Sequence, residues 1–299
     1  MSPALPMLAP LASGFGYAVA AIMIKRGGEG AGPWRVTFTV NWVITAVFSC
    51  GWLFPAAHPV SLVNIGHAAI SGGIFFIAQI FTFLALTRGD VSVATPVLGS
   101  KVVFVALFTM LFGLEKLGSA VWMAVLLTAA ATMLLGGGGH GSGGGAALFR
   151  SLFYGFSAAS IFALTDITQQ RWIPEWGLMP YVATLFFTMA LLSLSLLPLF
   201  VRDGHRMTSA NWRWLAGGAA LLSVQNTGVV WGIVTLGATT TNVLYNSRGV
   251  WSVILVWVAG SWFGNRESAR GRRVMLWRLA GSLLLLCAIF LLASDKVTR

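Results

Sequence analysis

The chain has 299 residues, of which 57% are hydrophobic and 9% are charged, and its mean hydropathy is +0.82. A soluble domain carries about 25% charged residues, so this chain has too few to cover a surface that faces water. The net charge of +11 would suit nucleic-acid binding, but nearly all Lys and Arg residues lie between apolar runs, where they would face lipid headgroups. We therefore expect a membrane protein with no nucleic-acid partner.

Ten apolar runs are long enough to cross a bilayer, whose core of about 30 Å requires roughly 20 apolar residues per helix. In chain order the predicted spans are 7–25, 36–56, 66–87, 91–112, 118–137, 148–170, 178–200, 212–235, 239–263 and 275–293. The first is not a cleavable signal peptide, because Lys25 and Arg26 follow it and no basic residue precedes it. Cys50 and Cys287 both lie inside apolar runs, which indicates neither a disulfide nor a metal site.

A glycine-rich segment separates the fifth and sixth spans. Residues 136–145 read GGGGHGSGGG, which contains G-x-G-x-x-G but follows a membrane helix and no strand, so we expect a linker and no cofactor. The predicted units are a first half at 1–137, a linker at 138–147 and a second half at 148–299. Because each half has an odd number of spans, the second half is inverted. The fold class expected is an all-α membrane protein of two inverted five-helix repeats around a central cavity.

Two basic residues lie well inside a span, and an internal match relates them. A shift of 147 residues places Gln79 on Asn226 and the pair Ser100-Lys101 on the pair Ser247-Arg248. Lys101 and Arg248 each lie about 14 Å from the face at which their own helix begins, at 1.5 Å per residue. In inverted halves these faces are opposite, so both side chains are expected near the midplane, where carriers with inverted repeats hold their substrates.

Insertion of a basic side chain at the centre of a membrane helix costs about 2.5–3.5 kcal/mol, so each of these residues needs a partner or a water-filled cavity. Snorkelling to an interface is the alternative. Asp166, near the end of the sixth predicted span, is the acid closest to a span interior and is a candidate proton or counter-charge site. It can neutralise at most one of the two bases, so an unpaired positive centre is expected.

Polar residues of nearby spans complete the candidate site. Thr241, Tyr245, Arg248 and Ser252 share one helical face. The predicted substrate-binding residues are Lys101, Arg248, Gln79, Asn226, Tyr245, Trp251, Asn242, Tyr17, Gln225 and Ser100. Hydrogen bonding between helices is an equal alternative for the amides, and simple packing for Tyr17. H-E-x-x-H, G-x-S-x-G and C-x-x-C motifs are absent, so neither an enzyme nor a metal site is expected.

Short motifs resemble a known family. The segment Lys25–Pro33 after the first span, Pro96 in the fourth, and Glu115 before Leu117-Gly118 are similar to EamA-type members of the drug/metabolite transporter superfamily, over essentially the whole chain. The resemblance implies a cavity lined by helices 1, 3, 4, 6, 8 and 9, with helices 5 and 10 peripheral. It also implies substrates such as amino acids, nucleotide sugars or sugar phosphates. The phosphate-carrying branch has an adjacent basic pair in helix 9, whereas this chain has Arg248 alone.

The function expected is a secondary transporter, an exporter or exchanger, that moves a small polar metabolite across the inner membrane by alternating access. The substrate would carry a carboxylate or other anionic group, as an amino acid does, and the carrier would be a monomer or homodimer. The alternative is a structural subunit or sensor whose buried bases pair with Asp166 or lipid. Most Lys and Arg residues outside the spans lie in the loops after helices 1, 3, 5, 7 and 9. Because basic loops face the cytoplasm, this predicts termini outside the cytoplasm, whereas the resemblance implies termini inside.

Overall fold

The computed structural model describes residues 4–56, 58–88, 97–136, 145–201, 207–259 and 272–298, and over these residues it is helical, with no strand. The helices are α1 (Ala4–Gly27), α2 (Pro33–Phe48), η1 (Ser49–Leu53), α3 (Leu62–Arg88), α5 (Lys101–Leu111), α6 (Ser119–Gly136), α7 (Gly145–Trp176), α8 (Leu178–Ser193), η2 (Leu194–Leu196), α9 (Leu197–Phe200), α10 (Ser209–Leu236), α11 (Ala238–Tyr245), α12 (Arg248–Ala259) and α13 (Arg272–Thr298). Pro96 and most of the predicted linker 138–147 lie outside the described residues.

These helices match the predicted spans in order. Six crossings are long and apolar enough to span a bilayer: α1, α2 with η1, α3, α7, α8 with its continuation through α9, and α10. Three shorter apolar helices, Val97–Leu111, Ser119–Leu135 and Leu279–Leu292, and the consecutive pair α11–α12 account for the remaining predicted spans. The all-α membrane fold is therefore confirmed.

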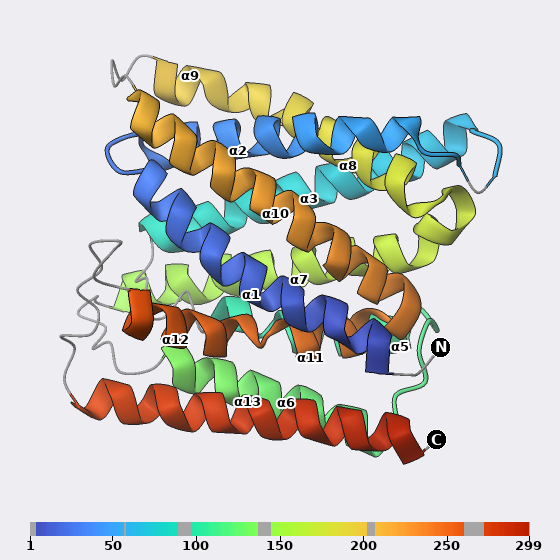
Figure 1. The fold of residues 1–299 in the computed structure, drawn as a ribbon, viewed down its shortest axis with the longest axis vertical. Coiled ribbons are helices and arrows are strands. Elements are labelled where there is room, and N and C mark those ends of the chain that lie inside the picture. Colours follow the sequence, from blue (N-terminus) through green and yellow to red (C-terminus); the bar gives the residue numbers. More distant parts are fainter. Residues whose placement is uncertain are drawn as a thin grey trace.

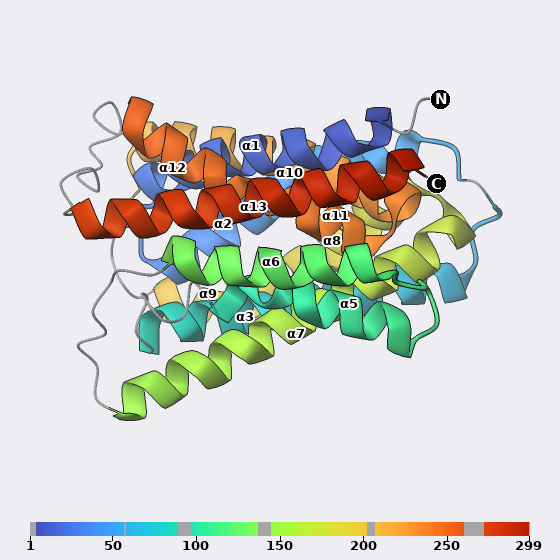
Figure 2. The same ribbon diagram turned by 90° about the horizontal axis from the view of Figure 1, so that it is seen from below.

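The direction of the helices shows the inversion. In Figure 1, α1 runs away from the end of the molecule that carries both termini, and its counterpart α7 runs toward it. The same opposition relates α6 to α13, and Figure 2 shows both termini at that same end. We call this end the terminal face and the other end the loop face, because the α1–α2 turn lies there.

The packing obeys the same symmetry. α1 packs most extensively on α10, and α7, the counterpart of α1, packs on α3, the counterpart of α10. The pairs α2–α8 and α6–α13 each join a helix to its own counterpart. Because most large contacts join one half to the other, the two halves interlock.

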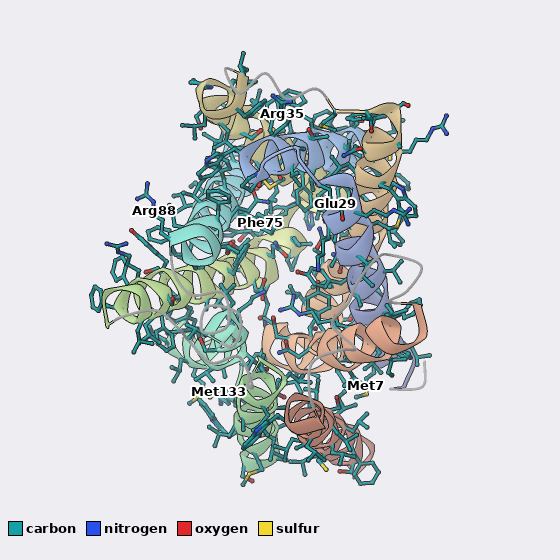
Figure 3. All side chains as sticks on the ribbon, turned by 90° about the vertical axis from the view of Figure 1, so that its left-hand side faces the viewer. Met7, Glu29, Arg35, Phe75, Arg88 and Met133 are labelled. Carbon is teal, nitrogen blue, oxygen red and sulfur yellow. The ribbon has the colours of Figure 1, made fainter. Side chains whose placement is uncertain are left out.

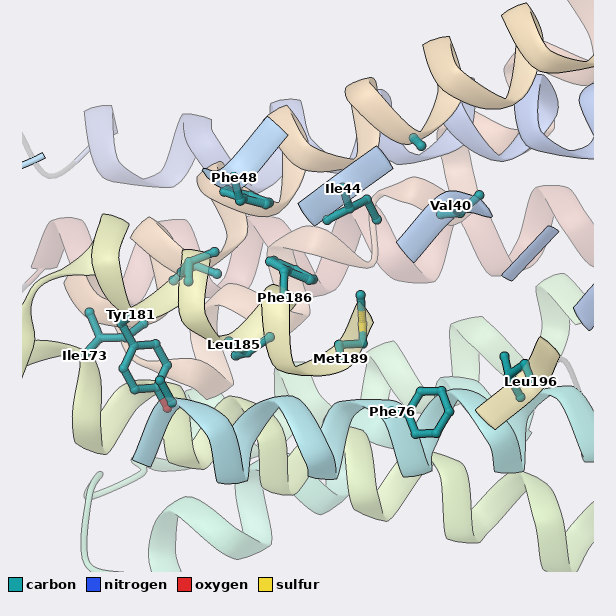
Figure 4. Packing of buried hydrophobic residues seen from close by; sticks show 14 of the residues in the cluster. Val40, Ile44, Phe48, Phe76, Ile173, Tyr181, Leu185, Phe186, Met189 and Leu196 are labelled. Atoms are coloured by element: carbon teal, nitrogen blue, oxygen red, sulfur yellow. The ribbon is translucent and has the colours of Figure 1, made fainter. Parts of the chain in front are cut away.

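The largest buried apolar cluster lies between α2, α3 and α8 and is drawn in Figure 4. Phe48 and Phe186 stack with ring centroids 4.8 Å apart, and Tyr181 and Met189 are fully buried beside them. Lipid is as apolar as these side chains, so close van der Waals contact stabilises this packing more than exclusion from water does.

α6 and α13 pack on one another at one edge of the molecule, as Figures 1 and 3 show. Their outward side chains, such as Leu126, Leu283 and Phe290, are exposed. Peripheral helices 5 and 10 are what the family resemblance implies. Figure 3 looks onto the loop face, where Glu29, Arg35 and Arg88 lie.

Candidate functional site

The fourth and ninth crossings are both interrupted in the middle. In the fourth, a turn at Ser100 follows a helical segment at 97–99, and α5 begins at Lys101; in the ninth, α11 ends at Tyr245 and α12 begins at Arg248. The backbone amides of Ser100 and Ser247 donate to carbonyls three residues earlier, at 3.0 and 3.1 Å. Such mid-helix tightening is typical of hinges. Arg248 lies about 16 Å along its crossing from Gly237, close to the centre of a core about 30 Å thick.

Lys101 is paired. Its Nζ lies 2.7 Å from Oδ2 of Asp166, and the side chains are 20% and 8% exposed. Asn242 Nδ2 donates to the same oxygen at 2.6 Å and to the carbonyl of Ala238 at 2.9 Å. The cluster joins α5, α7 and α11, so it brings together Lys101, Asp166 and Asn242 from both halves.

The length of α7 corrects the expected position of Asp166 within its span. The sequence placed it near the end of a span that stopped at residue 170, but α7 continues to Trp176 and Asp166 lies well inside it. The polar residues that suggested the end of the span are buried among other helices: Gln169 is 5% exposed, and Gln170 Oε1 accepts from the amide of Ala238 at 3.1 Å. A hydropathy window registers such residues as a loop although they are bonded inside the bundle.

Arg248 has no comparable partner. Its guanidinium carbon lies 4.8 Å from the ring centre of Tyr17 and 4.7 Å from that of Tyr245, and the two rings meet edge to face at 5.9 Å. Among the described residues, no carboxylate lies within ion-pair distance of it. Aromatic faces attract a cation but do not neutralise it. The site therefore keeps one positive charge after Lys101 and Asp166 cancel.

A close approach of α1 sets this geometry. A Cβ placed on Gly14 would lie 2.5 Å from Ser247 Oγ, 3.0 Å from the backbone nitrogen of Arg248 and 3.1 Å from the carbonyl oxygen of Tyr245. Only glycine fits against the interruption of the ninth crossing. Tyr17 lies one turn further along α1 on the same side, which places its ring on Arg248.

A pocket of about 470 Å³ leads from the loop face toward the centre. It is lined by Ile24, Lys25, Gly28, Gly32, Pro33, Val36, Thr37, Val40, Asn41, Gln79, Thr82, Phe83 and Phe162. Gln79 and Asn41 exchange two amide hydrogen bonds, at 3.0 and 3.1 Å. Phe162 lies near the middle of α7, and its ring centre is 5.9 Å from Lys101 Nζ. One aromatic ring therefore separates the pocket from the ion pair.

At the terminal face, two side chains accept hydrogen bonds from the start of α11. The N-terminus of α11 meets Oε1 of Gln170, which accepts from Ala238, and Oε1 of Glu115, which accepts from the amide of Thr239 at 3.4 Å. Gly237 precedes α11 with φ of 86°, and a Cβ there would lie 2.5 Å from Glu115 Oε1. A carboxylate at a helix N-terminus is stabilised by the helix dipole.

Four other predicted site residues make contacts of their own. Gln225 donates to Asn226 at 3.0 Å within α10, and Gln225 Oε1 is buried without a partner among the described residues. Ser100 donates to the carbonyl of Val97 at 2.6 Å. Trp251 meets Phe15 edge to face at 5.2 Å, and both are exposed, so it points away from the centre.

Sequence reasoning missed Asn41 and Phe162. Asn41 is fully buried and bonds to Gln79, and it is an amide inside an otherwise apolar span. A search for amide side chains inside the apolar spans, which selected Gln79, would also have selected Asn41. Nothing in the sequence distinguishes Phe162 from the other phenylalanines.

By its architecture, a bundle of inverted halves around buried charges belongs to the class of membrane carriers. A comparison with family models matches residues 5–137, the first half of the chain, to the EamA-like transporter family, which belongs to the drug/metabolite transporter superfamily. Members of this family are membrane transporters of small molecules. The resemblance drawn from the sequence is thereby confirmed over residues 5–137, and the helices of the structure are those of a multi-pass membrane protein.

Solved structures support the fold over the whole chain. One crystal structure, described only as that of a protein, covers 100% of both chains with a TM-score of 0.77 and 19% identity. Identity this low shows the fold alone. A comparison with curated proteins found no match.

Proposed function

We propose that the protein is a secondary transporter that carries a small monocarboxylate with one net negative charge across the inner membrane. Arg248 would bind the carboxylate at the centre of the bundle. The observation that carries this proposal is a half-buried guanidinium, held between Tyr17 and Tyr245, with no carboxylate of the described residues to pair with. A base at this depth is costly unless it serves a partner or a wet cavity.

The charge balance favours a monoanion. Lys101 and Asp166 cancel, which leaves the single charge of Arg248 for the substrate. In a low-dielectric site, a ligand that neutralises this charge avoids leaving an unpaired ion, whereas a phosphate dianion would bring one negative charge too many. The planar guanidinium also matches the two oxygens of a carboxylate.

A pocket at one face supports alternating access. The pocket leads inward from the loop face, whereas at the terminal face Gln170 and Glu115 accept hydrogen bonds from the start of α11, where Thr239 is fully buried. The two halves would rock about the interruptions at Lys101 and Arg248, with the substrate held between them. The proposed units are residues 1–137 and 148–299, joined by the linker 138–147.

The test begins with ligand binding. Purified protein is screened by thermal shift against amino acids, other monocarboxylates, dicarboxylates and sugar phosphates, since a ligand that binds the native state raises Tm. Uptake of the compounds that bind is then measured in proteoliposomes for the wild type, Arg248→Gln and Arg248→Lys, with the exposed Arg88→Gln as the matched control.

We expect monocarboxylates to give the largest shifts. Arg248→Gln should fold but lose uptake, Arg248→Lys should retain part of it, and Arg88→Gln should behave as wild type. Uptake by Arg248→Gln at the wild-type rate would refute the binding role.

One observation favours a second function, a non-transport structural subunit or sensor: Lys101 is satisfied by Asp166 within the protein. In that case no compound is taken up by the proteoliposomes, and Arg248→Gln lowers only the stability of the protein.

A further inference from the structure

The pocket at the loop face carries a charge that the proposed site around Arg248 does not use. Of the described residues that line this pocket, Lys25 is the only charged one, and none is acidic. Lys25 takes part in no ion pair among the described residues, although Glu29 follows it by four positions on the α1–α2 turn (Figure 3). A pocket whose wall carries one cation and no acid attracts anions and repels cations.

We propose that this pocket is an outer binding site, in which an organic monoanion with an apolar body is bound before it reaches Arg248. Lys25 binds the carboxylate, and the apolar wall of the pocket binds the body. The inference rests on the proposed function and narrows its substrate class, from any small monocarboxylate to one with a branched aliphatic or aromatic body.

The wall of the pocket carries the preference for an apolar body. Aliphatic and aromatic side chains from four helices, α1, α2, α3 and α7, contribute to it: Ile24, Val36, Val40, Phe83 and Phe162. The volume of about 470 Å³ lies within the range of ligand pockets, which bind small molecules mainly through apolar contact and orient them with a few polar groups. An anion as small as acetate would leave most of this wall unoccupied, so a larger body adds affinity.

A fixed amide can orient the ligand. Gln79 lines the pocket and is partly exposed, and Asn41 is fully buried beside it. The two side chains exchange hydrogen bonds at 3.0 and 3.1 Å, which hold the Gln79 amide in one orientation. An amide nitrogen carries two hydrogens, so Gln79 keeps one N–H that a carboxylate or hydroxyl oxygen of the ligand can accept.

The outer site lies at a different depth from Arg248. Lys25 is eight residues beyond Tyr17 on α1, or about 12 Å along the helix axis, and Tyr17 is the residue of α1 that contacts Arg248. Phe162 lies at the inner end of the pocket, where its ring centre is 5.9 Å from Lys101 Nζ. An anion at Lys25 is therefore in a bound state of its own, on the way to the centre of the bundle.

Protection of a cysteine in the pocket tests the outer site without measuring transport. Cys50 and Cys287, which are exposed, are first replaced by Ser, and Thr37→Cys then places a single thiol on the pocket wall. The rate of labelling by a charged methanethiosulfonate is measured in phosphatidylcholine nanodiscs with phenylacetate, with its neutral isostere phenylacetamide and with acetate. The ratio of the rates with and without each compound separates occupancy of the pocket from the reactivity of the thiol.

We expect phenylacetate to slow labelling and the other two compounds to have little effect, because only phenylacetate has both the charge and the apolar body. Lys25→Gln should raise the phenylacetate concentration that halves the rate by about tenfold, since it removes a charged partner of the carboxylate. Lys25→Arg should retain protection, and Arg88→Gln, which removes another exposed base of the loop face, is the matched control and should behave as wild type.

The variant Arg248→Gln separates the outer site from the proposed function. Protection at position 37 should persist in this variant, because the outer site does not include Arg248. Protection that disappears in Arg248→Gln overturns the outer site, and so does equal protection by phenylacetate and phenylacetamide. None of these results removes carboxylate binding at Arg248, which the thermal-shift screen and the uptake assay measure separately.

A phospholipid offers the same chemistry, an anion joined to an apolar body, and nanodiscs that contain phosphatidylglycerol distinguish this source. We expect labelling without added ligand to proceed at the same rate in both kinds of nanodisc. If phosphatidylglycerol slows labelling and phenylacetate does not, the pocket binds lipid and the outer site for a soluble monoanion is overturned.

Discussion

Gly14 packs closely against the interruption of the ninth crossing, so the structure predicts how much stability a larger side chain at this position would cost. Adding one methyl group by Gly14→Ala puts a carbon 2.5 Å from Ser247 Oγ, 3.0 Å from the amide nitrogen of Arg248 and 3.1 Å from the carbonyl oxygen of Tyr245. The hydroxyl can rotate away, but the two backbone atoms cannot. α1 must therefore move outward by a few tenths of an ångström.

The expected cost is about 1–3 kcal/mol, the usual penalty of overpacking a closely packed interior. Higher helix propensity of Ala offsets about 1 kcal/mol of it at most. Outward movement of α1 also carries Tyr17 away from Arg248, because residues three apart share a helical face. We therefore expect weaker ligand binding together with lower stability.

Thermal unfolding of the purified protein provides the assay, and Gly66→Ala in α3 is the matched control, because nothing lies within 4 Å of a Cβ at that position. Gly14→Ala should lower Tm by several degrees, and Gly66→Ala should leave it unchanged or raise it. Adding Ser247→Ala should recover part of the loss, because it removes the nearest atom and a buried hydroxyl that has no partner among the described residues. Equal Tm values for the two alanine variants would refute the close packing of α1 on the ninth crossing.

Two further predictions concern the pocket and the start of α11 at the terminal face. Gln79→Leu should lower Tm more than Asn41→Leu. The first change leaves the fully buried Asn41 without its described side-chain partner, at a cost of about 1–3 kcal/mol, whereas in the second the partly exposed Gln79 can bond to water instead. Equal losses of Tm would contradict this difference in access to water. Glu115→Ala should raise methanethiosulfonate labelling of a cysteine at position 239, since it removes the carboxylate from the start of α11. The neighbouring exposed Lys116→Ala serves as the control, and unchanged labelling in both variants would show that Glu115 does not close this face.

The ten crossings could be predicted because the bilayer imposes a local rule on each of them. A span must be apolar over about 20 residues wherever it lies in the fold, so length and hydropathy suffice to find it. The inversion also follows from counting, since an odd number of spans reverses the second half. The position of Lys101 and Arg248 at equivalent interruptions agrees with the internal match, because both residues begin a helical segment.

Side-chain partners could not be predicted in the same way. Asp166 pairs with Lys101 across the two halves, Tyr17 reaches Arg248 from a helix more than two hundred residues earlier, and Trp251 faces outward although it is three residues from Arg248. A helix that is apolar on all sides carries little periodicity to reveal which face is inward.

The sequence by itself thus determined the number of crossings, their inversion and the depth of the two basic residues, because the thickness and apolarity of lipid act on each span separately. Only the tertiary structure decided which base is neutralised and which remains charged. That depends on how each helix is rotated about its own axis and on which distant helix packs against it, and both are set by close packing and buried hydrogen bonds between segments that no local pattern relates.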